Sequence, residues 1–435
     1  MGRIHTIFTL LCVPLTQVYC QLLQSPGEQH DGQFLQLASS TGSFCPWHRD
    51  SLDLTPEWVA TERSPLELIP GSCVGNVSKE LCAYLSPAFA DSQGIAFVTS
   101  PQRAARLAQS TSLTDPLVHS QVERLNVATN PKWEMRHIPG KGMGVIATSH
   151  LNLGDHIMTS TPALVLDNGI LDYSDDEATE LRAQAIKHLP PALRSSFLKL
   201  TTHDDVTTMT ERIDKIVEVN SFELDTVGDV QDDEGEMSWL AVFPDISRLN
   251  HACRPNAQYY FDPLTMTQNV HAVRDIYPGE EITVSYINAF QSYRRRQERI
   301  HDMWHFGCTC DFCSKNSHQI KASDERLRQI TKLLKDLHDH TRLSKATPQT
   351  GELLISLYRQ EKLWYAMYEA YTLAALEYNF VGDAKLAIMH ASLAFEHGLA
   401  SAGPNDENIV SMRMLMKDPR RHWSWMYRIN KREGN

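Results

Sequence analysis

At residues 247–256 the chain reads Ser-Arg-Leu-Asn-His-Ala-Cys-Arg-Pro-Asn, and at residues 279–286 it reads Gly-Glu-Glu-Ile-Thr-Val-Ser-Tyr. An isolated Asn-His pair would indicate an ordinary turn, but here Asn, His, Cys, Pro and Asn fall within seven positions, 250–256. The second stretch has the β-branched residues of a strand and ends in Tyr286. Together the two stretches predict a site that combines polar loop residues with the end of a strand.

Short strands are predicted around both stretches, because β-type runs alternate there with Gly-containing turns. They cover residues 133–138, 145–148, 157–166, 257–261, 269–273 and 281–286. Residues 166–240 have helical spacing instead, so a helical insert is expected to divide the sheet. Its two apolar faces are Leu181, Ala185 and Leu189, and Ile213, Ile216, Val217 and Phe222.

The chain after Cys313 is predicted to be almost entirely helical, at residues 325–338, 352–378 and 383–397. An apolar stripe runs along the second of these helices, and such a stripe is typical of a buried core. The stripe consists of Leu357, Trp364, Met367 and Tyr371. Antiparallel helix pairs similar to tetratricopeptide units fit this pattern, although no strict internal period is present.

The composition is that of an ordinary folded protein: 435 residues, 42% hydrophobic and 22% charged, with a net charge of −12. Residues 166–240 hold 18 acidic and 6 basic residues, an excess equal to the net charge of the whole chain. This balance argues against binding nucleic acid by phosphate neutralisation, which requires clustered Lys and Arg. The acidic insert has two open interpretations, a solvated helical face or a negative surface that steers a Lys-rich substrate.

The N-terminus has the layout of a secretory signal, with a charged start, an apolar run from Thr6 to Val18 and then Tyr19-Cys20. This run of about thirteen residues is too short to span a bilayer as a helix. The alternative is a buried apolar segment, and Pro14 inside the run counts against cleavage. The glycosylation pattern Asn76-Val77-Ser78 fits secretion. No other stretch approaches transmembrane length.

The nine cysteines fall into two groups, which suggests two separate chemistries. Residues 21–130 are rich in Ser, Pro, Gln and Gly, so a loop-rich segment stapled by a disulfide is predicted there. This segment contains three cysteines, Cys45, Cys73 and Cys82, so one thiol would remain unpaired after a disulfide forms. The first group is Cys12, Cys20, Cys45, Cys73 and Cys82, and the second is Cys253, Cys308, Cys310 and Cys313.

In combination, these motifs resemble the SET domain family. The stretches at 247–256 and 279–286 look like its two signature segments, in which one strand end passes through a loop to form a knot-like cofactor and lysine site. Lys141-Gly142-Met143-Gly144 resembles its Gly-x-Gly turn, and the Cys-x-Cys-x-x-Cys run at 308–313 resembles its post-SET cysteine cluster. The divided SET region and helical C-terminal region are similar to the SET and MYND branch and its fungal relatives. The insert has no cysteine, so the MYND zinc finger is expected to be absent.

The resemblance covers residues 130–315 well and 320–420 loosely. It implies an α+β fold, with small SET sheets around a knot-like site, a helical insert and an all-α C-terminal region. The expected organisation is a signal peptide at 1–20, a loop-rich segment at 21–130, a SET domain at 131–290 with its acidic insert at 166–240, a post-SET zinc region at 291–316, and a tetratricopeptide-like region at 320–430.

S-adenosylmethionine is the cofactor that the resemblance implies. Lys141, Met143 and Gly144 would border it, while Asn250 and His251 would hydrogen-bond its amino-acid and adenosine parts. Ser247 and Leu249 would line the same wall, Asn220 would be a further polar contact, and Phe306 would cover the adenine. For Asn220 and Phe306 the alternatives, a helix-end Asn and a core Phe, stay open.

Zinc is the second expected cofactor. The trio Cys308, Cys310 and Cys313 leaves a tetrahedral zinc one ligand short, and Cys253 completes the set of four. The alternative is a set of disulfides or free thiols, although the trio is too tightly spaced for simple pairing. A bound zinc would pin the C-terminal flap over the cofactor site.

Tyr286 is the predicted catalytic residue, because methyl transfer mainly requires alignment of a neutral amine with the methyl group and exclusion of water. The expected function is therefore a protein-lysine methyltransferase, acting on a histone or another protein. A catalytically inactive SET-like interaction scaffold and a secreted disulfide protein without cofactor are the alternatives. No direct nucleic-acid partner and no membrane span are expected, and the oligomeric state is not predicted. The signal-like N-terminus indicates the secretory pathway, whereas the resemblance implies the nucleus or cytoplasm.

Overall fold

The computed structural model describes residues 64–76, 79–118, 131–172, 174–202, 205–227, 239–341 and 344–433. The signal-like segment, Cys12, Cys20 and Cys45 lie outside these ranges, as do Val77 and Ser78 of the glycosylation pattern and the acidic run at 228–238. In the ranges given, no helix combines the length and the apolar character needed to cross a bilayer.

The largest sheet has six strands, and half of them come from the N-terminal side of the predicted SET region. Strands β3 and β7 pair in parallel, and the other neighbours are antiparallel. Their order is β1 (Glu67–Asn76), β2 (Lys79–Ser86), β3 (Ile95–Thr99), β7 (Leu164–Asp167), β9 (Trp239–Val242) and β8 (Ser221–Leu224).

The prediction of a loop-rich segment is therefore corrected for residues 64–118. Besides β1 to β3 this part forms the short helices α2 (Phe89–Ser92), α3 (Pro101–Leu107) and α4 (Thr111–Thr114). All five residues of β3 are buried, as expected for a central strand covered on both faces. Many of the Ser, Pro and Gly residues that suggested loops lie inside these elements, and Pro70, Gly71, Ser72 and Gly75 all belong to β1.

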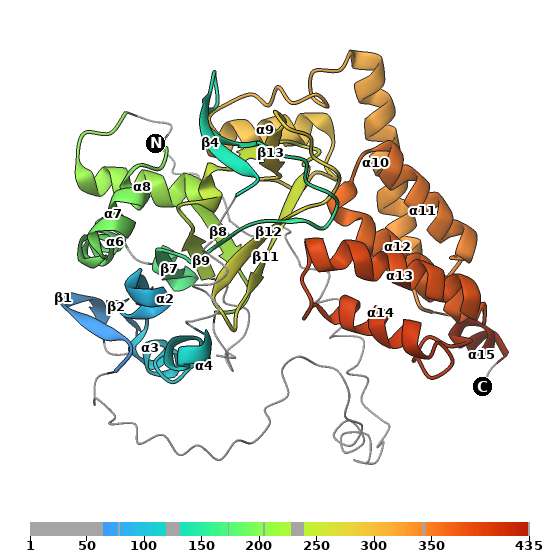
Figure 1. Ribbon diagram of the computed structural model, residues 1–435, viewed down its shortest axis with the longest axis horizontal. Coiled ribbons are helices and arrows are strands. Elements are labelled where there is room, and N and C mark those ends of the chain that lie inside the picture. Colours follow the sequence, from blue (N-terminus) through green and yellow to red (C-terminus); the bar gives the residue numbers. More distant parts are fainter. Residues whose placement is uncertain are drawn as a thin grey trace, which may run out of the picture. The chain divides into compact units, whose positions relative to one another are not determined.

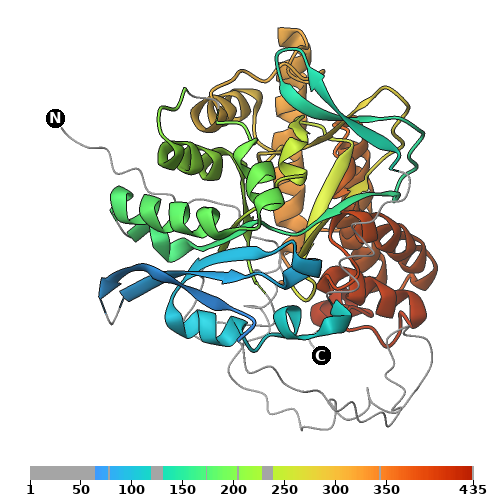
Figure 2. The ribbon, with the colours of Figure 1, turned by 60° about the vertical axis from the view of Figure 1, so that its left-hand side comes forward.

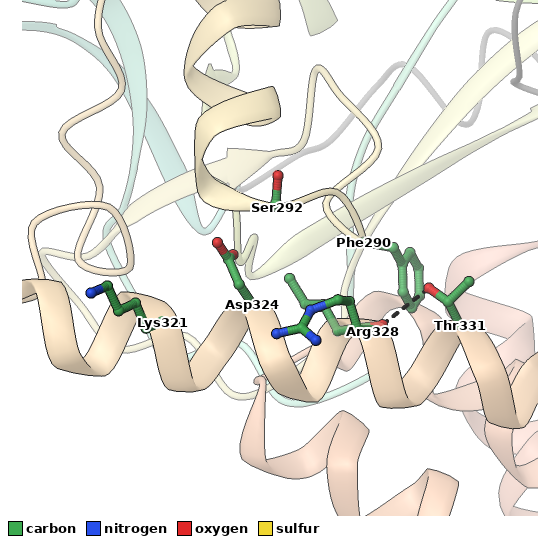
Figure 3. Close-up of a pocket in the computed structure, with 7 residues that line it drawn as sticks. Phe290, Ser292, Lys321, Asp324, Arg328 and Thr331 are labelled. Carbon is green, nitrogen blue, oxygen red and sulfur yellow. Dashed lines mark hydrogen bonds between the residues drawn. The ribbon is translucent and has the colours of Figure 1, made fainter.

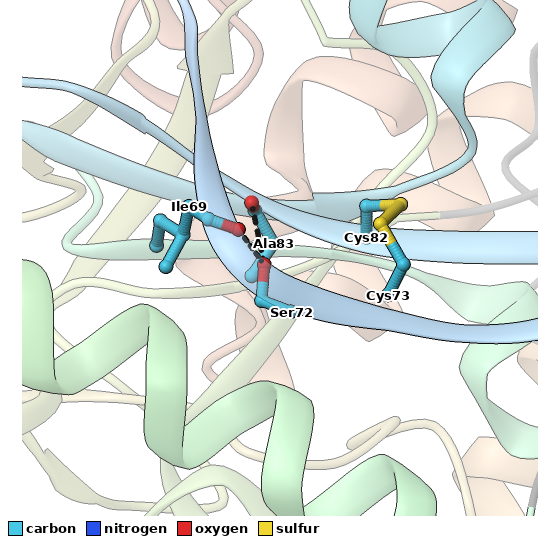
Figure 4. Close-up of a disulfide and its surroundings, with 5 residues drawn as sticks. All are labelled: Ile69, Ser72, Cys73, Cys82 and Ala83. Atoms are coloured by element: carbon cyan, nitrogen blue, oxygen red, sulfur yellow. Dashed lines mark hydrogen bonds between the residues drawn. A yellow bond between two sulfur atoms is a disulfide. The ribbon is translucent and has the colours of Figure 1, made fainter.

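The disulfide predicted for this segment joins Cys73 and Cys82, which are directly paired across β1 and β2 (Figure 4). The register of the two strands shifts between Leu68 and Cys73. Ser72 Oγ fills this irregularity, lying 2.6 Å from the carbonyl oxygen of Ile69 and 3.1 Å from that of Ala83. The serine thus connects the two strands within the shift, and the disulfide joins them where regular pairing resumes at Cys73.

The predicted helical insert forms three helices, α6 (Asp175–His188), α7 (Pro191–Leu198) and α8 (Met209–Asn220). A capping box of Ser174 and Glu177 begins α6. The helix packs on β1, β2 and β3, and Figure 1 shows β1 and β2 in blue below it. The predicted apolar faces are buried, except that the half-buried Phe222 belongs to β8 rather than to a helix.

Two small sheets carry the predicted signature segments. The run predicted as one strand at 157–166 forms two strands in different sheets, and Pro162, which lacks a backbone donor, lies between them. The strand predicted at 281–286 ends two residues before Tyr286. One sheet has the order β10 (Asn250–His251), β13 (Glu281–Val284), β5 (Gly142–Ala147), β4 (Trp133–Ile138), and the other β11 (Ala257–Asp262), β12 (Thr267–Ala272), β6 (His156–Ser160).

The C-terminal region is all-helical, as predicted. Successive helices from α10 to α14 pack against one another, and α13 also contacts β11 and β12 (Figure 2, orange to red). The helices are α9 (Tyr293–Trp304), α10 (Ser317–His338), α11 (Pro348–Gln360), α12 (Met367–Phe380), α13 (Ala384–Ser401), α14 (Glu407–Lys417) and α15 (Tyr427–Glu433).

The prediction of a single helix at 352–378 is wrong, because the helix is interrupted between α11 and α12. Lys362 has a positive φ of 54°, and the buried Glu361 side chain is held by charged partners from elsewhere in the chain. The apolar stripe continues through the break, with Leu357, Met367 and Tyr371 buried. Periodicity therefore could not reveal this turn.

Candidate functional site

The centre of the site is the parallel pairing of β10 with β13, which places Asn250 opposite Thr283 and His251 opposite Val284. Only two residue pairs form this ladder, so it depends on added support. Asn256 supplies it, because its Nδ2 donates to the Glu281 carbonyl oxygen (2.9 Å) and its Oδ1 accepts from the Thr283 N–H (2.8 Å). The two predicted signature segments thus lie side by side.

Asn250 connects β10 to the predicted glycine turn. Its Nδ2 donates to Glu281 Oε1 (2.9 Å) and lies 3.3 Å from the Met143 carbonyl oxygen. A Cβ on Gly144 would lie only 2.7 Å from the same Nδ2 atom and 2.3 Å from Ile138 Cδ1. A side chain at position 144 would therefore push Asn250 out of place. Lys141 pairs with Glu281 at 2.5 Å, at the exposed rim of this cluster.

The ring of His251 is engaged on both sides within the protein. Its Nδ1 accepts from the Tyr286 N–H (3.1 Å), so the proton is assigned to Nε2, which faces Cys253 Sγ at 3.4 Å. Burial lowers the pKa of His251 to about 4, and the ring is neutral at pH 7. The ring therefore connects Tyr286 to the cysteine cluster.

Tyr286 lies just beyond the end of β13 and packs against other aromatic rings. Its hydroxyl donates to the Leu249 carbonyl oxygen (2.7 Å), and its ring centroid is 5.3 Å from that of His251 and 5.2 Å from that of Trp304. Burial raises the pKa of Tyr286, so the phenol stays protonated across the physiological range. The half-buried side chain is thus fixed at the end of the strand.

Ser247, Leu249 and Asn220 line the neighbouring wall. Ser247 Oγ donates to the Asn220 carbonyl oxygen (3.3 Å), and Leu249 is buried. The Asn220 amide donates to the carbonyl oxygens of Thr201 and Ile216, at 3.0 and 2.8 Å. Asn220 therefore lies beside Ser247 while its amide nitrogen stabilises the end of α8, so the helix-end alternative describes its side-chain contacts.

Phe306 and Trp304 form the aromatic part of the site. Both pack around the buried cysteine cluster together with Tyr286. Trp304 Nε1 donates to the Val219 carbonyl oxygen (3.0 Å), which connects α9 to the end of α8. Trp304 was not predicted from the sequence, although the Trp-x-Phe spacing that ends two positions before Cys308 was a usable signal.

The four cysteines predicted as metal ligands lie together. The Sγ atoms of Cys253, Cys308, Cys310 and Cys313 are all within 4.8 Å of one another. Cys253 Sγ is 3.9 Å from that of Cys308 and 3.5 Å from that of Cys313, distances too long for disulfides. Hydrogen bonds from Cys253 and Cys308 lower the pKa of Cys310 and of Cys313, whereas hydrogen bonds with the neighbouring thiols raise the pKa of Cys253. The cluster could hold a metal ion as thiolates.

Two buried guanidinium groups accompany this cluster, and neither was singled out from the sequence. Arg296 in α9 is 1% exposed, and the charges of Cys253 and Cys313 raise its pKa against the effect of burial. Arg254 directly follows Cys253, and its side chain is 5% exposed. A lone Arg in a loop motif or a helix gives no sign in the sequence that it is buried.

A surface pocket between the start of α9 and α10 contains none of these residues (Figure 3). The Tyr293 N–H at the start of α9 donates to Asp324 Oδ1 at 2.8 Å, so a carboxylate already occupies that helix end. We assign no function to this pocket. It is lined by Phe290, Ser292, Lys321, Asp324, Leu327, Arg328 and Thr331.

Comparison with known proteins matches the part of the chain that carries β10, β13 and Tyr286, but not Trp304, Phe306 or the cysteine trio. Residues 142–287 match the family model of the SET domain. This range includes β5, the helical insert, β10 and β13, and it ends one residue after Tyr286.

Several curated proteins are similar to parts of the chain. N-lysine methyltransferase SMYD2-B of Danio rerio is 34% identical over 135 residues, which are 29% of this chain and 31% of that protein. Histone-lysine N-methyltransferase set5 of Schizosaccharomyces pombe is 30% identical over 195 residues, 44% of this chain and 54% of that protein. N-lysine methyltransferase SMYD2 of Homo sapiens is 31% identical over 145 residues, 31% of this chain and 33% of that protein. The similarity thus spans about a third to a half of these relatives.

Proposed function

We propose that this chain, in which residues 142–287 match the SET domain model, transfers a methyl group from S-adenosylmethionine to a lysine of a protein substrate. The observation that carries the proposal is the pairing of β10 with β13, because it joins Asn250 and His251 to the strand that ends at Tyr286. The relatives named as lysine methyltransferases support the same activity.

S-adenosylmethionine, when bound, supplies an electrophilic methyl group on a sulfonium. Its polar end suits the rim around Asn250, because the described hydrogen bonds use the Nδ2 of this residue and leave its Oδ1 as an acceptor for an ammonium group. The exposed Met143 and Lys141 border the same rim. The residues proposed to hold the cofactor are Lys141, Met143, Gly144, Asn220, Ser247, Leu249, Asn250, His251 and Phe306.

Tyr286 acts as the catalytic residue by alignment. Its hydroxyl proton is committed to the Leu249 carbonyl, so the lone pairs of the phenol oxygen can face the methyl group. Its raised pKa keeps it neutral, which avoids an anion next to the reacting amine. The rings of His251 and Trp304 beside it exclude water, and an apolar environment favours the neutral lysine amine that transfer requires.

The cysteine cluster holds zinc in this proposal. A tetrahedral zinc with sulfur ligands at about 2.3 Å places the sulfurs about 3.8 Å apart. The distances from Cys253 Sγ to those of Cys308 and Cys313, 3.9 and 3.5 Å, fit this geometry. Zinc would fix Cys253, and through it the His251 ring, to the segment that follows α9.

The substrate is a lysine-containing protein, histone or not, and the excess of acidic residues in the insert favours a basic one. Two sets of features favour different cellular locations. Zinc thiolates favour reducing surroundings, whereas the Cys73–Cys82 disulfide and the signal-like N-terminus favour the secretory pathway. Sequencing the N-terminus of the mature protein distinguishes them, because cleavage near Cys20 requires export.

Methyl transfer is tested with the full chain, radiolabelled S-adenosylmethionine and a panel of histones and other lysine-rich proteins. Tyr286→Phe is expected to reduce transfer by about 100-fold or more while calorimetry shows unchanged cofactor binding. Tyr277→Phe, at an exposed tyrosine before β13, is the matched control and keeps full activity. Cofactor binding without transfer in the unaltered protein would favour the scaffold alternative, and full turnover by Tyr286→Phe would refute the catalytic assignment.

A further inference from the structure

Arg254, inside the first signature segment, is held by carbonyl groups from several parts of the chain. Its Nη1 donates to the carbonyl oxygens of Cys253 (2.8 Å) and Ala289 (3.1 Å). Its Nε and Nη2 donate to the backbone oxygen and to Oε2 of Glu361, at 2.5 and 2.8 Å. A planar guanidinium can make all four contacts at once, which a lysine could not do.

Glu361 extends this connection into the C-terminal helices. It lies at the end of α11 and is fully buried. Besides Arg254 its carboxylate accepts from two residues of α10, Ser323 Oγ (2.7 Å) and Arg326 Nε (2.6 Å). One carboxylate therefore joins α10, α11 and the loop that carries Cys253.

The same guanidinium also contacts the other half of the cysteine cluster. The ring of Phe312, between Cys310 and Cys313, lies 4.2 Å from the central carbon of the Arg254 guanidinium. Such a contact is favourable between a cation and an aromatic face. Arg254 thus touches both chain segments that supply the four cysteines.

We propose that Arg254 is a positioning residue, through which the C-terminal helices hold the cysteine cluster and the Asn250–His251 segment in place. An effect of Arg254 on methyl transfer rests on the proposed function. The structural connection from the C-terminal helices to the cysteine cluster does not depend on that function. A buried ion pair adds little net stability compared with apolar packing, so its main effect here is on geometry. Loss of Arg254 leaves Glu361 paired with Ser323 and Arg326, while the Cys253 loop loses its anchor.

The test compares Arg254→Met with Arg428→Met in the full chain. Arg428 is an apt control, since it is also 5% exposed in its side chain, pairs with the buried Glu377 and lies over an aromatic ring, that of Phe380. All three of these control residues belong to the C-terminal helices. Both variants therefore lose a buried ion pair, but only one loses a contact with the cysteine cluster.

Amide hydrogen exchange and zinc release are the readouts. In Arg254→Met we expect exchange at 249–256 and 308–314 to rise about tenfold or more, with Arg428→Met close to the unaltered protein there. Zinc transfer to a chelator should accelerate about 10- to 100-fold in Arg254→Met alone. Glu361→Gln is the second variant and should change the same two segments to a smaller extent.

Equal effects of both Met variants on these segments would overturn the proposal, because Arg254 would then contribute only general stability. Unchanged exchange in both Arg254→Met and Glu361→Gln would also overturn it. Neither readout uses methyl transfer, and exchange does not require zinc. An inactive but zinc-binding protein with segment-specific exchange would refute the proposed function and leave the link intact.

Discussion

Replacing Asn256 by aspartate tests how the two signature segments are held together. The side chain is 3% exposed and bridges the Glu281 carbonyl oxygen and the Thr283 N–H. Asn256→Asp keeps the shape and the acceptor but removes the donor, so a buried carbonyl oxygen loses its partner and faces a carboxylate. An orphaned buried acceptor costs about 1–3 kcal/mol, and the added repulsion brings the expected loss to about 2–4 kcal/mol.

This variant should also acquire a pH dependence of a known sign. Burial raises the pKa of the introduced carboxyl above its unfolded value, so the folded variant keeps a proton to higher pH. The protonated form can again donate to the Glu281 oxygen. Its unfolding free energy should therefore fall as pH rises from about 4 to the raised pKa, and level off above it.

The assay is urea unfolding at pH 5 and pH 8, with calorimetry of S-adenosylmethionine binding at pH 8 below the unfolding transition. Asn269→Asp is the control, because Asn269 is 7% exposed and bridges Thr159 and Thr267 in a different sheet. Both variants should lose stability, but only Asn256→Asp should lose cofactor affinity. Unaltered cofactor affinity in Asn256→Asp would refute the role of this bridge in building the site.

Three further predictions concern the metal, the disulfide and the insert. The purified chain should contain about one zinc ion, and Cys310→Ser should lower both the zinc content and the melting temperature; full retention of zinc would contradict the four-cysteine site. Replacing Cys73 and Cys82 together by Ser should lower the unfolding free energy by about 2–3 kcal/mol in urea titrations, with unchanged zinc content; a simultaneous loss of zinc would show that the two cysteine groups are coupled. Neutralising four acidic residues of the insert should raise the Michaelis constant mainly at low salt, and an unchanged constant would remove the steering hypothesis. These four are Asp232, Asp233, Glu234 and Glu236, which lie outside the described residues.

Cys253 and Tyr286 have the surroundings that were predicted for them, whereas the ring of His251 has different partners. Cys253 lies with the other three cysteines, and Tyr286 is enclosed by Leu249, His251 and Trp304. A Cys253 remote from the trio, or a Tyr286 facing bulk water, would have removed the physical basis of the methyl-transfer proposal. The ring of His251 instead contacts Tyr286 and Cys253, so its direct hydrogen bond to the cofactor stays a prediction.

The sequence by itself determined the local elements and the chemistry of the site, because residue type and spacing act over short distances. Runs of β-type residues indicated β4 to β7 and β11 to β13, helical spacing indicated α6 and α8, and the number and spacing of the cysteines indicated a metal. Only the tertiary structure decided which distant segments meet. Residues 64–118 complete the main sheet, and the helix break at Glu361 brings a carboxylate to Arg254. Such pairings depend on burial and on partners more than a hundred positions away along the chain, which local patterns do not encode.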